Sequence, residues 1–153
     1  MSKRIPDVHW DAETNTATCV LTDTYDKKYI GIAVCHPDDE DFTSEKTGCE
    51  IAVRRAEIEY IKAARDKLKN ELGALEHLYY VMNRSKHFNP KSYENIMLQR
   101  QIKLKKSDLA TIKEMLTTAQ ENLRWYVDEK EKLYKKLRFN RKVNSQQDEL
   151  DEN

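Results

Sequence analysis

The sequence predicts an α+β protein, with a small N-terminal antiparallel sheet of two or three strands followed by a long antiparallel helical hairpin that oligomerises. Two short β-branched runs near the start predict the sheet, and seven-residue apolar repeats over the rest predict the hairpin. The chain also has only 3 Gly and 3 Pro among 153 residues, with 35% charged. Few turns and many charges are typical of long, solvent-exposed helices.

We expect three parts on this basis. Residues 1–43 form the small sheet and an acidic connector, residues 44–142 form the two-helix hairpin, and residues 143–153 form a disordered acidic tail. The tail contains four acidic residues and no basic one.

The predicted strands are Ala17–Thr22 and Tyr29–Cys35, which the polar run Asp23–Lys28 separates. Both are rich in residues that favour strands, and the polar run is long enough for a hairpin loop. Arg4–Trp10 is a candidate third strand, which Pro6 restricts to an edge. A sheet this small needs another element to pack on.

The first helix is predicted from Ser44 to about His87, with Thr43 or Ser44 as its N-cap. Apolar residues recur at two heptad positions along it. The first position holds Ile51, Ile58, Arg65, Leu72 and Tyr79, and the second holds Arg54, Ile61, Leu68, Leu75 and Met82. This 3.5-residue repeat predicts a coiled-coil seam.

A turn is predicted at Arg84–Ser92, because Asn89 followed by Pro90 is a typical helix start. A second apolar repeat then runs through Ile102, Leu109, Leu116, Leu123 and Leu137, with Lys130 as an interruption. Two long helices joined by a short loop fold back antiparallel. A break near Ser107–Asp108 is an alternative.

One helical pair buries too little surface for a seam of this length. Apolar residues also lie off the seam, at Leu78, Tyr80, Tyr93, Met97, Trp125 and Val127. We therefore expect a homodimer or higher oligomer, with two hairpins forming a four-helix bundle.

The zero net charge hides a strong segregation along the chain. Residues 1–44 carry a net charge of −5 (4 basic, 9 acidic), whereas residues 89–142 carry +7 (14 basic, 7 acidic). Three cysteines without CxxC spacing indicate a reduced, cytoplasmic protein, and no apolar run predicts a signal peptide or a membrane span. The basic runs Arg100–Lys106 and Lys130–Lys142 fit solvated helix faces better than nucleic-acid binding.

The connector AVCHPDDEDF, residues 33–42, combines Cys35, His36 and four acids. One interpretation is a metal site with Cys49 as a further ligand, but zinc sites use paired ligands and calcium loops alternate their oxygen ligands around a glycine. The interpretation that we favour is a connector whose acids stabilise the start of the next helix. We expect no metal and no cofactor.

No nucleophile elbow, P-loop, GxGxxG or HExxH occurs, and we expect no catalytic residues. The best candidate ligand-binding residues are polar or aromatic and fall in two groups, Arg54 with Arg55 and Arg84 with Lys86, His87 and Phe88. An aromatic ring beside cations suits a nucleotide or other anion. The alternatives are that Phe88 packs on its own helices and that Arg54 pairs with an acid across the bundle.

The segment GIAVCHPDDEDFTSEK, followed by TGCEIAVRRAEIEYIKAARD, resembles small accessory proteins of phages and prophages of Gram-positive bacteria. The resemblance covers about residues 16–66. The order of sheet, long helix and long helix is also similar to the Thoeris anti-defence sponge family, oligomers that sequester cyclic nucleotide signals. These resemblances imply a counter-defence role in the host cytoplasm.

The leading functional hypothesis is therefore a non-enzymatic phage protein that binds itself and sequesters an anionic nucleotide signal at a protomer interface. One alternative is an inhibitor of a host defence protein, similar to an anti-CRISPR, whose acidic first part mimics nucleic acid. Another is a structural coiled-coil phage protein.

Overall fold

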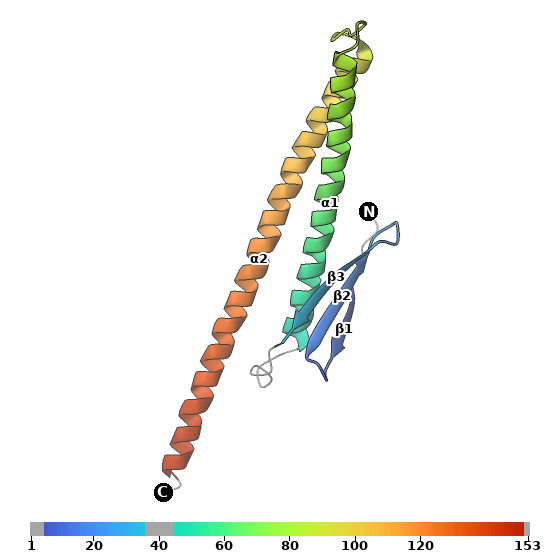
Figure 1. The fold of residues 1–153 in the computed structure, drawn as a ribbon. Coiled ribbons are helices and arrows are strands. Elements are labelled where there is room, and N and C mark those ends of the chain that lie inside the picture. The colour runs from blue at the N-terminus through green and yellow to red at the C-terminus, as the bar shows by residue number, and fades with distance from the viewer. Residues whose placement is uncertain (1–4, 36–44, 152–153) are drawn as a thin grey trace. The chain divides into compact units, whose positions relative to one another are not determined.

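The computed structural model describes residues 5–35 and 45–151. It contains three strands and two long helices in the order β1 (Asp7–Asp11), β2 (Thr16–Thr22), β3 (Lys28–Val34), α1 (Glu45–Asn83) and α2 (Tyr93–Asp151) (Figure 1). The predicted α+β class, with an antiparallel sheet and a helical hairpin, is confirmed. The chain divides into two compact units, one of residues 1–59 with 119–153 and one of residues 60–118.

The sheet is a meander with β2 in the centre, paired antiparallel to β1 and to β3. The candidate third strand exists and lies at an edge of the sheet, but it spans Asp7–Asp11 rather than Arg4–Trp10, so Pro6 precedes it. The side chains of Ala17, Cys19 and Leu21 alternate along β2 and are buried. One face of the sheet is therefore a core face.

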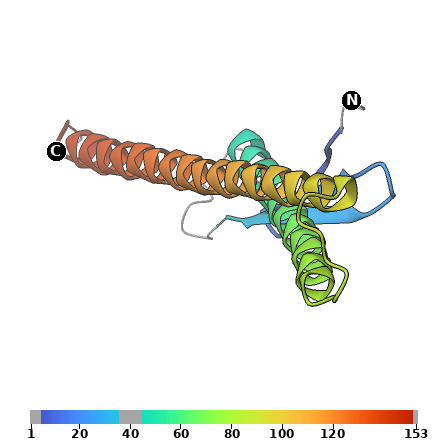
Figure 2. The same ribbon diagram turned by 90° about the horizontal axis from the view of Figure 1, so that it is seen from above.

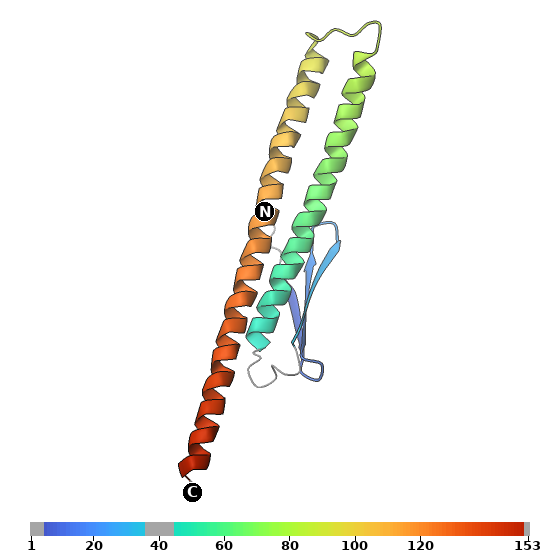
Figure 3. The ribbon, with the colours of Figure 1, turned by 60° about the vertical axis from the view of Figure 1, so that its left-hand side comes forward.

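The first turns of α1 cover this core face (Figure 3). The contact is built from small residues, because Gly48, Ala52 and Ala56 recur every four residues and lie on one side of the helix. A Cβ added to Gly31 of β3 would collide with the Ala52 carbonyl oxygen and the Ala56 amide nitrogen. Glycine at this position therefore permits the close approach of helix and strand.

The unit of residues 60–118 is the helical hairpin, with the end of α1 and the start of α2 joined at the turn that Figure 2 shows from above. Leu109 and Leu116 of the predicted apolar repeat are buried, and so is Leu98 of α2. Between the helices, the Lys105 ammonium lies 2.6 Å from the Glu71 carboxylate. This ion pair holds the pKa of Glu71 below its usual value.

Helix α2 begins later than the Asn89–Pro90 signal indicated. The Asn89 side chain instead accepts a hydrogen bond from the Lys91 amide at 3.0 Å, which makes a turn. The Ser92 hydroxyl caps the helix by accepting from the Asn95 amide at 3.3 Å. The serine three residues further on therefore supplies the helix start.

Helix α2 is continuous through Ser107 and reaches Asp151. The alternative of a break near Ser107–Asp108 is therefore not found, and the structure differs from the predicted disordered tail after residue 142. No Gly or Pro interrupts the helix, and hydroxyl groups inside it bond back to its own carbonyls, as Ser145 does to Arg141 at 2.9 Å. The predicted caps Thr43 and Ser44 lie outside the described residues.

Candidate ligand pocket

Arg54, one of the predicted ligand-binding residues, takes part in a polar cluster between α1 and α2 within the sheet-bearing unit. Its guanidinium lies 3.1 Å from the Glu50 carboxylate and stacks over the Tyr126 ring, 4.8 Å from the ring centre. The Tyr126 hydroxyl donates a hydrogen bond to the other Glu50 oxygen at 2.9 Å. Arg54 therefore pairs with an acid in the structure, but with Glu50 on its own helix rather than with an acid across the bundle.

The cluster changes the titration of both partners of that hydrogen bond. The bond from Tyr126, followed by the bond from Arg54, lowers the pKa of Glu50. Burial, followed by the bond to Glu50, raises the pKa of Tyr126. At neutral pH, Glu50 is thus a carboxylate that accepts and Tyr126 a phenol that donates, which locks α2 onto the start of α1.

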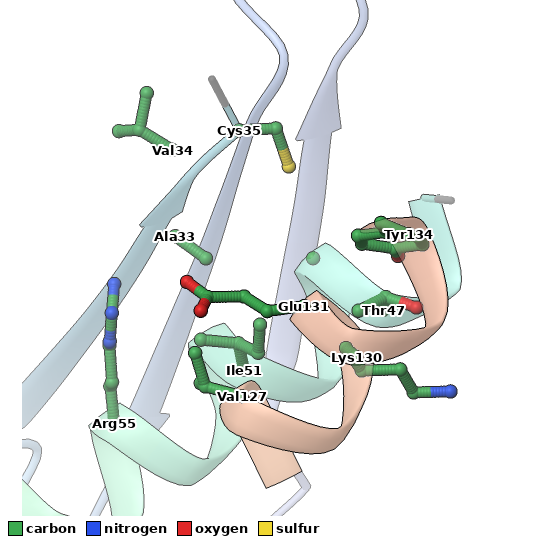
Figure 4. A pocket seen from close by; sticks show the side chains of 11 residues that line it. Ala33, Val34, Cys35, Thr47, Ile51, Arg55, Val127, Lys130, Glu131 and Tyr134 are labelled. Carbon is green, nitrogen blue, oxygen red and sulfur yellow. The ribbon is translucent and has the colours of Figure 1, made fainter. Parts of the chain in front are cut away.

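A pocket of about 290 Å³ lies beside this cluster, between the end of β3, the first turns of α1 and one stretch of α2 (Figure 4). Its apolar lining comes from Ala33, Ile51 and Val127. Its polar lining comes from Thr47, Arg55, Lys130, Glu131 and Tyr134, with the Cys35 thiol at the end of β3. The volume is near the lower limit for small-molecule sites.

The polar groups are distributed around the pocket rather than gathered at one point. In Figure 4, Arg55 stands on one side, and the Glu131 carboxylate extends toward that side, whereas Tyr134 lies with Thr47 on the other. Arg55 is fixed by a hydrogen bond from its Nη1 to the Ile32 carbonyl oxygen at 2.5 Å. A ligand in this pocket therefore meets a cation, a carboxylate and an aromatic ring.

The Tyr134 hydroxyl is buried and makes no hydrogen bond within the described residues. A buried polar atom without a partner costs about 1–3 kcal/mol. A ligand that supplies a donor or acceptor to this hydroxyl would recover that energy. Tyr134 is therefore the pocket residue whose hydroxyl a ligand would stabilise by forming a hydrogen bond with it.

Cys35 belongs to the pocket, but its thiol is not set up for nucleophilic attack. Burial raises the pKa of the Cys35 thiol, and burial does the same for Cys49. A protonated thiol is a poor nucleophile. Across residues 5–35 and 45–151, no three His, Cys, Asp or Glu side chains gather closely enough to hold a metal ion. His36 and the connector acids lie outside these ranges.

The second group of predicted residues lies in the other unit, at the turn between α1 and α2. Phe88 packs edge-on against Tyr79, with ring centres 6.2 Å apart, and Arg84 stacks over Tyr80 at 4.7 Å. The Phe88 ring thus packs on its own hairpin. A hollow of about 350 Å³ at this turn is lined by His87 and Phe88, among others. Arg84 and Lys86 do not line it.

Sequence reasoning found Arg55 but missed Tyr134, Glu131 and the role of Lys130. Lys130 gave a signal, since it interrupts the apolar repeat where a leucine belongs. Here the lysine stacks over Tyr126 at 5.4 Å and lines the pocket. Tyr134 and Glu131 gave no signal, because nothing local distinguishes them from neighbours on a charged helix.

Comparisons with protein-family models, with curated proteins and with solved structures found no match. A functional assignment therefore depends on the chemistry of the pocket itself. In the part of the chain that the structure describes, no helix is long and apolar enough to cross a membrane.

Proposed function

We propose that this chain is a non-enzymatic binding protein of the phage counter-defence type, which sequesters a small anionic nucleotide signal in the host cytoplasm. The observation that carries the proposal is a pocket lined by two cations, Arg55 and Lys130, and by an aromatic residue, Tyr134, whose buried hydroxyl has no hydrogen-bond partner among the described residues. Cations attract phosphate, and an aromatic ring offers a stacking surface for a base.

The lining of the pocket supports binding rather than catalysis. Among the described residues it includes no histidine, and the thiol of Cys35 has a raised pKa. A nucleophile needs an adjacent base or a lowered pKa. The pocket instead combines apolar walls with a few polar groups of fixed position, which is the composition of a recognition site.

The size of the pocket limits the size of the ligand that it can hold. A volume of about 290 Å³ accommodates one nucleotide unit rather than a long polyphosphate or an oligonucleotide. We therefore expect a mononucleotide, or one half of a cyclic dinucleotide or ADP-ribose-type signal.

Isothermal titration calorimetry of the full chain with ADP-ribose-type and cyclic nucleotides tests the function. The Lys130→Gln variant should bind about tenfold more weakly, because a hydrogen bond to a charged group contributes roughly 1.5–3 kcal/mol. Tyr134→Phe should also weaken binding, since it removes the buried hydroxyl.

Lys132→Gln is the matched control, because Lys132 lies two residues along the same helix and pairs with Glu129 at 3.2 Å. Its affinity should equal that of the unmodified chain. Absence of heat with every nucleotide would refute the proposal. Recovery of a host protein from a lysate, unaffected by nucleotides, would favour the inhibitor alternative.

A further inference from the structure

One face of the helical hairpin, in the unit of residues 60–118, carries apolar side chains that nothing in the described chain covers. On α2, Leu104 is 65% exposed and Met115 is 52% exposed. On α1, Leu78 and Val81 are 47% and 52% exposed. Surfaces of this kind on a helical pair are typical of association sites.

Leu104 also lines a groove of about 530 Å³ between the helices. Ala74 and Leu75 line it from α1, and Leu104 lines it from α2. Ala74, Leu78 and Val81 follow one another at spacings of four and three, so they form one stripe on α1. We call this groove with its flanking stripes the hairpin face.

Along α2, the hairpin face follows a regular pattern. Tyr93, Met97, Leu104, Thr111 and Met115 lie within about 20° of one direction around the helix axis, at 100° per residue. The seam residues Leu98 and Leu109 lie more than 100° away, toward α1. The helix therefore has a second apolar stripe in addition to the one that packs against α1.

Two opposite charges interrupt this stripe at equal distances from its centre. Arg100 precedes Leu104 by four residues, and Asp108 follows it by four. Both side chains are exposed. The other charged pair at the groove, Glu71 and Lys105, is already joined across the hairpin at 2.6 Å.

We propose that the hairpin face binds a second copy of this chain, with the two α2 helices antiparallel and the two-fold axis at Leu104. In that arrangement, Arg100 of each copy faces Asp108 of the other, and the two Leu104 side chains meet at the axis. In a two-fold interface the same surface of both copies meets, so that surface must be complementary to itself. The hairpin face meets this condition, because Arg100 and Asp108 lie four residues on either side of Leu104. A parallel pairing would place Arg100 against Arg100 and Asp108 against Asp108.

The result is a four-helix bundle formed by two hairpins, in which each exposed stripe becomes part of a core. A nucleic acid fits this face less well, because the groove is largely apolar and Asp108 repels phosphate. The proposal depends on the hairpin face alone and is independent of the ligand pocket.

Charge reversal tests the arrangement by sedimentation equilibrium of the full chain. Arg100→Asp and Asp108→Arg should each weaken self-association at least about tenfold, because each places like charges opposite one another at two points. The double variant R100D/D108R should restore dimerisation. An equimolar mixture of the two single variants should form heterodimers, since every facing pair is then opposite in sign.

Lys103→Glu is the matched control, because Lys103 is next to Leu104 in sequence but about 100° away around the helix. It should dimerise like the unmodified chain. Leu104→Ser should abolish dimerisation, with circular dichroism used to verify that the helices are retained. An unmodified chain that is monomeric at every concentration overturns the proposal. Single variants that dimerise normally, or a mixture without heterodimers, overturn it as well.

Discussion

At the scale of single residues, the close approach of β3 to α1 depends on one glycine. Gly31 is buried in β3 and faces the backbone of α1 at Ala52 and Ala56. Glycine usually weakens a strand, but a side chain here would force the helix away from the sheet. The absence of a side chain at this position therefore allows β3 and α1 to pack closely.

We expect Gly31→Ala to destabilise the protein by about 1–3 kcal/mol, the usual cost of overpacking. Gly73→Ala is the control, because a Cβ at Gly73 meets nothing within 4 Å and alanine is the better helix former. It should stabilise by about 0.5–1 kcal/mol. Urea denaturation followed by circular dichroism measures both. Equal effects of the two substitutions would contradict the packing described here.

The Glu50–Tyr126 hydrogen bond makes a second prediction, on pH. The pKa of Glu50 is lower in the folded chain than its usual value of 4.5. Its stabilising contribution is therefore complete above that value and is lost as the pH falls through the folded pKa. The pKa of Tyr126 is raised above 10.0, so its contribution is complete below that value and is lost at higher pH.

Tyr126→Phe should cost about 1 kcal/mol at pH 7, because it leaves Glu50 without one donor. The loss should shrink as the pH falls below about 4.5, where Glu50 is protonated in the unfolded chain. Denaturation midpoints from pH 3 to 7 measure this. The control Tyr80→Phe, at a side chain that is 53% exposed, keeps the ring over which Arg84 stacks and should leave the midpoints unchanged. A Tyr126→Phe loss that is constant with pH would exclude the hydrogen bond as its cause.

At the scale of elements, the start of α2 depends on a serine cap. Ser92 lies just before the helix, where its carbonyl accepts from the Ile96 amide at 3.0 Å and its hydroxyl accepts from the Asn95 amide. The sequence signal of Asn89 and Pro90 correctly located the turn but not the cap. Several residues in that turn can accept hydrogen bonds, and the local sequence does not rank them.

Ser92→Ala should destabilise by about 1 kcal/mol, because an amide in the first turn loses its partner. Ser107→Ala is the control, since Ser107 is exposed within α2 and alanine favours the helix. Hydrogen exchange of the first amides of α2, followed by nuclear magnetic resonance, should show faster exchange in Ser92→Ala alone. Unchanged exchange at those amides would indicate another cap.

At the scale of the whole chain, hydrophobic periodicity predicted the element order well. Apolar and polar residues alternate along the strands, and apolar residues recur every seven residues along the helices. Each pattern therefore indicates which face of its element is buried. The end of α2 was predicted less well, because composition suggested disorder after residue 142, whereas the helix continues to Asp151. An acidic, polar segment is compatible with both states when no Gly or Pro forces an end.

The candidate site was predicted only in part. Arg55 was identified, yet the pocket places it with Lys130, Glu131 and Tyr134, which lie more than seventy residues later in the chain. Arg54 was also identified, and it stacks on Tyr126 instead. A heptad pattern states which face of a helix is covered, but not which distant side chains meet across it.

The sequence alone thus determined the class of fold, the order of its elements and the position of the turn between the helices. These depend on interactions between near neighbours, which local periodicity records. Only the tertiary structure decided that Gly31 touches α1, that Tyr126 bonds to Glu50 and that a pocket forms beside them. Those features depend on contacts between residues far apart in the chain, for which local sequence carries no record.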